Sequence, residues 1–159
     1  NELGRSRAMS SFVFWFGKHK GRPLEQVIFS DPSYAVWYLK ETNSKSYTTA
    51  FNKLADKLKA RSTTVKCARC SRLATGYLLE RDPQGVFANR SEPSCGSCEV
   101  EHWESRQFFA ANMDGLMDFC RHEKTRAQAK RFGRMVASFF GGGEKHRRLT
   151  RSVAMAIFA

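Results

Sequence analysis

Four of the five cysteines of this 159-residue chain form two closely spaced pairs, and each pair encloses two residues. This spacing lets a tight turn aim both thiolates of a pair at one point. Two such turns supply the four sulfur ligands that a tetrahedral zinc ion prefers. The pattern predicts one zinc ion held by Cys67, Cys70, Cys95 and Cys98. The ion is expected to be structural, because four thiolates leave no open position for a reacting water.

Two other cysteine chemistries account for less of this pattern. A redox dithiol needs a single Cys-x-x-Cys pair and explains half of it. Paired disulfides are typical of secreted domains that are smaller and richer in cysteine, and no signal peptide is apparent. Cys120 is expected to be a buried free thiol in a reducing compartment. These features predict an intracellular protein, which would be nuclear in a eukaryote.

The 24 residues between the two pairs, 71–94, are expected to contain a β-hairpin. Residues 74–80 are rich in strand formers, residues 82–85 (Asp-Pro-Gln-Gly) have turn chemistry, and residues 85–88 return to an extended pattern. A hairpin between two cysteine knuckles, over about residues 65–100, resembles the zinc-ribbon family. A ribbon of this size cannot bury a core of its own, so the metal is expected to fix its fold.

Residues 11–17 (S-F-V-F-W-F-G) alternate in a way that predicts a β-strand. Phe12, Phe14 and Phe16 would lie on one face, with Val13 and Trp15 on the other. A basic turn follows over residues 18–24, and residues 24–29 predict a short helical turn or strand.

Two helices are expected next. Asp31 can accept hydrogen bonds from free amides as the N-cap of the first helix, and Pro32 suits its first position. That helix is expected to run to about residue 41. A second helix over residues 45–61 has apolar residues at helical spacing on one side and lysines on the other.

Several fixed residues occur in order across residues 12–59. The pattern is aromatic-Gly-Lys-x-(Lys)-Gly-x-Pro-Leu, then Asp-Pro-x-Tyr, then Trp. It is formed here by Gly17, Lys18, Gly21, Pro23, Leu24, Asp31, Pro32, Tyr34 and Trp37. It resembles the small module at the C-terminus of exodeoxyribonuclease X-type proteins. The resemblance implies an accessory module associated with nucleic acid. It does not imply nuclease chemistry, because nothing in this chain matches the catalytic exonuclease domain of those proteins.

Residues 102–159 are expected to be helical and basic. Apolar residues recur at helical spacing over 103–120, with an interruption near Gly115. Residues 124–140 predict another helix, and the last residues predict a short amphipathic one. The fold class expected is therefore α+β. Its units would be a disordered or vector-derived segment (1–10), a strand-plus-helices module (11–62), a zinc ribbon (63–101) and the basic helical region (102–159).

The charge balance points to a polyanionic partner. The chain has 27 Lys and Arg against 15 Asp and Glu, a net charge of +12 and a pI near 9.9. No apolar run reaches the roughly 18 residues of a membrane span, so no membrane partner is expected. We expect DNA to be bound without chemistry and with little base specificity, and RNA is the second candidate substrate. The expected phosphate contacts are Lys18, His19, Lys20, Arg22, Lys57, Lys66, Arg69, Arg72, Arg126, Lys130, Arg131 and Arg134. Trp15 is the leading candidate for stacking on a base, ahead of Trp37 and Trp103.

Two other functions stay open. His102, Asn112 and His122 faintly resemble the His-Asn-His nuclease family, whose chemistry needs a histidine base and a divalent metal. The second knuckle precedes His102 here, and only Cys120 stands where a cysteine pair is usual. Either histidine is also a substitute zinc ligand if one cysteine is unused. The other alternative is a protein-interaction adaptor that docks through the ribbon. Strand preference and oligomeric state do not follow from the sequence.

Overall fold

The computed structural model describes residues 12–83, 85–98, 105–122, 125–141 and 148–159, without the side chains of residues 82, 85–90 and 122. Within these ranges the chain is α+β, as expected. The helices are α1 (Leu24–Ser30), α2 (Pro32–Glu41), α3 (Lys45–Ala60), α4 (Met113–His122), α5 (Arg126–Phe139) and α6 (Arg151–Ile157). The strands are β1 (Gly76–Asp82), β2 (Gly85–Ser94) and β3 (Arg106–Ala110).

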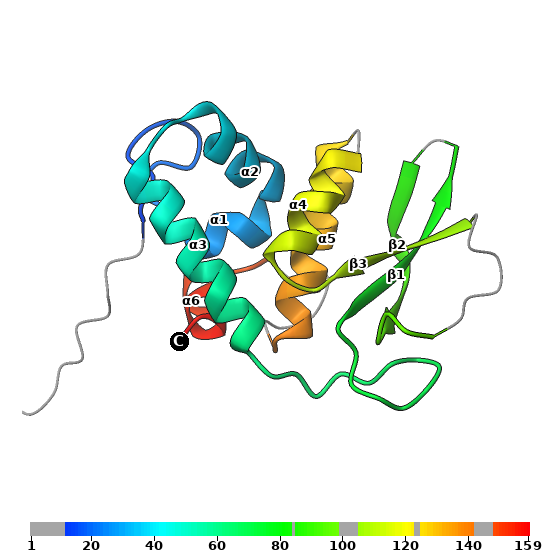
Figure 1. Ribbon diagram of the computed structural model, residues 1–159. Helices are drawn as coiled ribbons and strands as arrows, with labels where there is room; N and C mark the ends of the chain where they lie inside the picture. The colour runs from blue at the N-terminus through cyan, green and yellow to red at the C-terminus, as the bar shows by residue number, and fades with distance from the viewer. Residues whose placement is uncertain (1–11, 84, 99–104, 123–124, 142–147) are drawn as a thin grey trace, which may run out of the picture.

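The elements form three layers (Figure 1). Helices α1, α2, α3 and α6 lie together on one side, and a three-stranded antiparallel sheet of order β2-β1-β3 lies on the other. Helices α4 and α5 separate them: α5 contacts both α1 and β2, while α4 contacts both α2 and β3. The two central helices therefore connect the N-terminal helices to the sheet that follows the first knuckle.

One apolar core runs through these layers. The rings of Phe119 in α4 and Phe132 in α5 stack 4.6 Å apart, and Phe109 of β3 meets Phe119 edge-on at 5.2 Å. Further along, Phe29 of α1 stacks on Phe158 at 5.4 Å. All five side chains are almost fully buried. The segments expected as separate units thus share a core, and the boundaries between them stay predictions.

The strand predicted over residues 11–17 is wrong in the described part of that segment. Residues 12–23 form a loop closed by an isolated bridge between Val13 and Pro23, and the Phe14 N–H donates to the Arg22 carbonyl. Gly17 and Gly21 have φ values of 78° and 80°, which turn the chain back on itself. Alternating burial fails with the strand, since Phe14 is buried while Phe16 is exposed.

The two helices expected next are present as α2 and α3. Ser44 caps α3 by accepting from the Tyr47 N–H. Capping of α2 by the Asp31 side chain is not observed. The Asp31 carboxylate instead accepts from Lys18 and His19, because the preceding loop brings both side chains onto it.

The hairpin between the knuckles is confirmed as β1 and β2, with a register shift between Leu79 and Glu80. The helix expected over residues 103–120 is wrong for Arg106–Ala110, which is strand β3 paired antiparallel with β1, and is confirmed from Met113 onward as α4. The prediction failed because β2 covers only one edge of β1, which leaves the other edge for β3, and because the Phe108-Phe109 pair is compatible with a strand as well as a helix. Helices α5 and α6 occur where the sequence predicts them. Among the described residues, none of the helices combines the length and apolar content needed to cross a bilayer.

Candidate functional site

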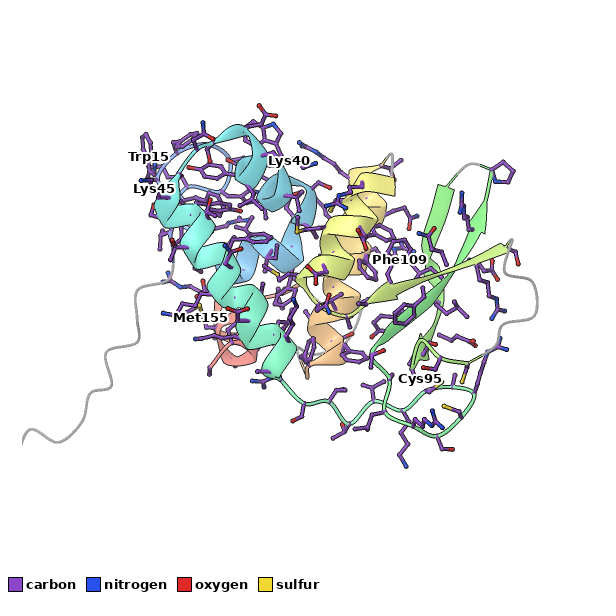
Figure 2. All side chains as sticks on the ribbon, in the orientation of Figure 1. Trp15, Lys40, Lys45, Cys95, Phe109 and Met155 are labelled. Atoms are coloured by element: carbon purple, nitrogen blue, oxygen red, sulfur yellow. The ribbon has the colours of Figure 1, made fainter. Side chains whose placement is uncertain are left out.

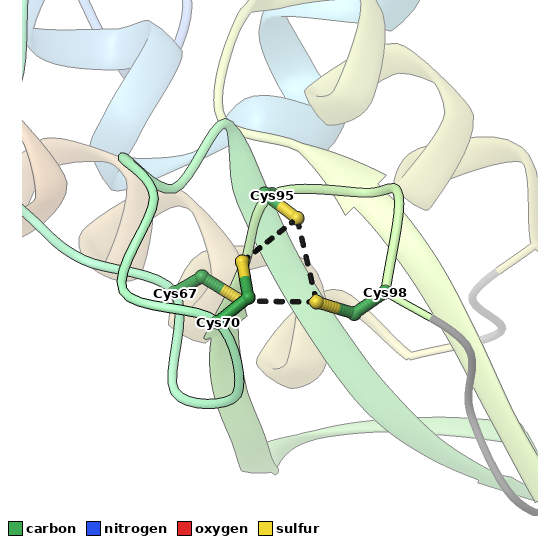
Figure 3. A group of neighbouring side chains, drawn as sticks. All are labelled: Cys67, Cys70, Cys95 and Cys98. Carbon is green, nitrogen blue, oxygen red and sulfur yellow. Dashed lines mark hydrogen bonds between the residues drawn. The ribbon is translucent and has the colours of Figure 1, made fainter.

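The four paired cysteines converge on one point at the open end of the β1–β2 hairpin, where β1 begins and β2 ends (Figure 3). Their Sγ atoms lie 3.7 Å apart for Cys67 and Cys98, 3.6 Å for Cys70 and Cys95, and 3.6 Å for Cys95 and Cys98. Four sulfurs placed tetrahedrally at about 2.3 Å from an ion are about 3.8 Å from one another. A disulfide would need about 2.05 Å, and all four cysteines are free. The group could therefore hold a metal ion.

Backbone hydrogen bonds hold the first knuckle against the end of β2. The Cys67 N–H donates to the Arg72 carbonyl at 2.7 Å, which closes the turn. The Ala68 N–H donates to the carbonyl of Pro93 at 3.0 Å, two residues before the second knuckle. These bonds fix the first knuckle in position relative to the second.

The second knuckle depends on Gly96. Its φ of 77° is a conformation that side chains with a Cβ rarely adopt, and a Cβ there would lie 3.2 Å from the Phe108 ring. The Gly96 N–H donates to Ser94 Oγ at 3.1 Å, which orients the turn. The Phe108 ring of strand β3 therefore packs against the second knuckle of the candidate metal centre.

The thiol pKa values diverge within the cluster. Hydrogen bonds from backbone N–H groups, that of Arg69 first, lower the pKa of Cys67 to about 6. The backbone N–H of Ser97 lowers the pKa of Cys95. Hydrogen bonds to the neighbouring sulfurs of Cys70 and Cys95 raise the pKa of Cys98 to about 12. Backbone dipoles thus favour the first thiolates, whereas the last proton leaves readily only when a cation offsets the accumulated negative charge.

The fifth cysteine lies apart from this centre. Cys120 in α4 is partly buried, and Ser33 Oγ donates to its sulfur at 3.9 Å. Burial raises the pKa of this thiol. It is a free thiol, as expected, although it is less fully buried than the sequence suggests.

The basic loop over residues 18–22 is fastened to the buried Asp31. Lys18 Nζ lies 2.6 Å from Asp31 Oδ2. His19 Nε2 lies 2.9 Å from the same oxygen and must carry the proton, since a carboxylate only accepts. His19 is buried, so it holds the loop in place and does not present a charge to solvent. Lys20 is exposed and Arg22 is half-buried.

The other cations expected to contact phosphate differ in their surroundings. Arg69 pairs with Glu92 at 2.7 Å, and Lys57 Nζ donates to the Phe158 carbonyl at 3.1 Å. Arg134 is half-buried, with its Nε enclosed. The members of the set that are exposed and whose side chains have no hydrogen-bond or ion-pair partner among the described residues are Lys20, Lys66, Arg72, Arg126, Lys130 and Arg131.

These cations do not form one continuous surface around the metal centre. The loop that carries Lys18 and Lys20 lies beside α2 at one end of the molecule, and the knuckle that carries Lys66 and Arg72 lies at the opposite end (Figure 1). A cationic surface held together by the metal would therefore not include the loop cations. The metal can organise the knuckle cations, while the loop cations depend on Asp31.

Two of the tryptophans expected to stack on a base, Trp15 in the loop and Trp37 in α2, are exposed, and Phe16 is an exposed aromatic beside them that sequence reasoning did not propose. Trp15 is 72% exposed, Phe16 39% and Trp37 48%. The rings of Trp15 and Phe16 lie 4.5 Å apart, and Phe16 contacts Tyr38 at 5.9 Å. The available signal was the run F-V-F-W-F, which has more large apolar residues than one short segment can bury.

The histidine-based nuclease alternative cannot be located in the structure. Residue His102 lies outside the described residues, as does Trp103, and the side chain of His122 is likewise not described. Asn112 caps the start of α4 by accepting from the Gly115 N–H at 3.0 Å. This contact accounts for Asn112 without a catalytic role.

Known proteins offer no close relative for comparison. No protein-family model, no curated protein and no solved structure matches the chain. What the chain does must therefore be argued from the metal centre and the exposed loop themselves.

Proposed function

We propose that this protein binds nucleic acid, with DNA favoured over RNA, and carries out no chemistry on it. A zinc ion held by the four cysteines would stabilise the ribbon. Zinc is favoured because four thiolates at tetrahedral spacing are the donor set that this ion prefers. With all four ligand positions filled by protein, the ion has no site at which to activate water.

The observation that carries the proposal is a set of exposed cations that have no carboxylate partner among the described residues. Lys20, Lys66, Arg72, Arg126, Lys130 and Arg131 are exposed. In the part of the chain that the structure describes, none of them pairs with a carboxylate. Cations left unpaired on a chain of net charge +12 are available to phosphates.

These cations are spread over the loop beside α2, helix α5 and the first knuckle, so the expected mode is backbone tracking along a strand. Lys20 would contact one stretch of phosphates beside α2. Lys66 and Arg72 would contact another beside the metal centre. Removing the metal should weaken only the second contact, because the first depends on Asp31.

The test is fluorescence anisotropy with labelled single-stranded DNA, duplex DNA and RNA over a salt series. Binding should weaken as salt rises, with a log–log slope of about 0.7–0.9 per phosphate contacted. Lys20→Glu should weaken binding and reduce the slope, whereas the matched Lys20→Arg retains the charge and should bind nearly normally. Lys18→Glu is a poor choice, since it would place a carboxylate against the buried Asp31.

Two results would overturn the proposal. Absence of binding to all three nucleic acids at low salt would remove its basis and favour the adaptor. Appearance of shortened product strands in the presence of magnesium would instead establish the nuclease alternative.

A further inference from the structure

We infer that the 12–23 loop and α2 form a base-stacking platform for single-stranded nucleic acid, centred on Trp15. This inference rests on the proposed function and specifies which strand form is bound and through which side chains. The platform consists of Trp15, Phe16 and Trp37, with Lys18 and Lys20 beside them in the loop.

The platform is aromatic and open to solvent. Trp15 is 72% exposed, so most of its indole is open to solvent, with the Phe16 ring packed against it at 4.5 Å. Trp37 is 48% exposed and contacts Tyr34 at 5.5 Å. Through Phe16 and Tyr38 the exposed rings continue into the buried core (Phe16–Tyr38, 5.9 Å; Trp37–Tyr38, 6.4 Å). Figure 2 shows Trp15 at the outer edge of the helical end, far across the molecule from Cys95.

Backbone hydrogen bonds and the contacts of Asp31 hold the loop of the platform in one conformation. Three backbone hydrogen bonds close the loop: Phe14 N–H to Arg22 O at 3.0 Å, Gly21 N–H to Phe14 O at 2.7 Å, and Lys20 N–H to Gly17 O at 3.1 Å. Asp31 fastens the loop to the start of α2 through Lys18 and His19. A rigid loop loses little conformational entropy on binding, so exposed aromatics on it are well suited to capture a ligand.

The charge of the loop selects the ligand. Residues 12–24 contain Lys18, His19, Lys20 and Arg22 and no acidic residue. Aromatic rings beside cations match the alternation of bases and phosphates in an unpaired strand. In a duplex the base faces are stacked on one another and cannot reach an indole. Single strands are therefore the expected ligand, and a protein partner would have to be acidic to suit the same surface.

The test compares binding of a fluorescein-labelled oligothymidine of about 15 nucleotides with that of its duplex at low salt. Trp15→Ala should weaken single-strand binding by between about 5-fold and about 100-fold, the loss expected for one stacked base. Trp15→Phe should restore much of the affinity, whereas Trp15→Leu should not. Stacking should also quench tryptophan fluorescence in the wild type and much less in Trp15→Phe.

The matched control is Leu73→Ala. Leu73 is 56% exposed and lies beside the first knuckle, at the other end of the molecule. The Leu73→Ala variant should therefore bind the oligothymidine with normal affinity. Equal melting temperatures and metal contents for wild type, Trp15→Ala and Leu73→Ala would show that the variants fold.

Three results would overturn the base-stacking platform. Normal oligothymidine binding by Trp15→Ala, together with weakened binding by Lys20→Glu, would overturn the platform and leave the proposed function standing. Equal affinity of Trp15→Leu and wild type would show an apolar contact instead of stacking, and would also overturn it. Failure of the wild type to bind any nucleic acid would remove both.

Discussion

Replacing Asp31 with asparagine tests whether a buried ionic clamp fixes the 12–23 loop. The Lys18 side chain is 43% exposed, so water screens its pair with Asp31 to about 0–1 kcal/mol. The bond from the buried His19 is charge-assisted and contributes about 1.5–3 kcal/mol. Asparagine keeps an oxygen that still accepts from His19, which retains about 1 kcal/mol. We expect Asp31→Asn to lower the free energy of unfolding by about 0.5–3 kcal/mol, or Tm by roughly 1–12 °C.

The lowered pKa of Asp31 determines how the contribution of the clamp to stability depends on pH. Burial alone would raise the pKa of Asp31, but hydrogen bonds from Lys18 and His19 outweigh it and hold the pKa below the ordinary value of 3.8. The unfolded chain therefore binds the proton more tightly than the folded one. The clamp stabilises the fold fully above that ordinary value, and its contribution is lost as pH falls through the lowered pKa.

The assay is urea denaturation followed by circular dichroism at several pH values. The difference in unfolding free energy between wild type and Asp31→Asn should be constant from about pH 5 to 7 and shrink below about pH 4. Acid also protonates the cysteine thiolates, but it does so in both proteins, and the difference cancels this effect. Asp56→Asn, at an exposed position of α3, is the control and should stay within about 0.5 kcal/mol of wild type. A difference that is as large at pH 3 as at pH 7 would refute the clamp.

Two further perturbations test the metal centre and the packing of the helices. Elemental analysis should find about one zinc per chain, and Cys95→Ser should abolish zinc binding. The loss should lower Tm by roughly 8–16 °C, which is the stabilisation expected from a bound ion whose free concentration is about 1,000 times its Kd. The control Cys120→Ser should keep the zinc, and full zinc occupancy in Cys95→Ser would contradict the ligand assignment. In Gly133→Ala the new Cβ would clash with the Phe29 carbonyl oxygen and lie 2.7 Å from Pro32 Cγ, which forces α5 away from α1 and α2. We expect a loss of about 1–3 kcal/mol in the same urea assay, and an unchanged midpoint would show that these helices are less tightly packed than the structure indicates.

The cluster of four cysteines that could hold a metal ion was predictable from local sequence, because its geometry is largely local. Two residues between paired cysteines already determine a turn that directs both sulfurs inward, and only the meeting of the two turns needs the hairpin. Helices α2 and α3 were predictable for a similar reason, since Pro32 and Ser44 mark their starts and apolar spacing marks their buried faces. The proposed nucleic-acid contacts had weaker support, because an excess of cations says little about where they lie.

The misassigned elements share a non-local cause. The F-V-F-W-F run reads as a strand, but a strand needs a partner, and in the described residues only a single bridge forms between Val13 and Pro23. Strand β3 was missed for the opposite reason: its partner is the free edge of β1, about 30 residues earlier in the sequence. Local spacing cannot show whether such an edge is available.

The sequence by itself determined which four cysteines could hold a metal ion, the α+β class and the strongly positive charge, because each follows from residue type and short-range spacing. Only the tertiary structure decided that His19 is buried against Asp31, that the knuckle and loop cations lie apart, and that Trp15 stays in solvent. Burial and pairing depend on which distant segments meet, and here the packing of α4 and α5 between the N-terminal helices and the sheet sets those meetings.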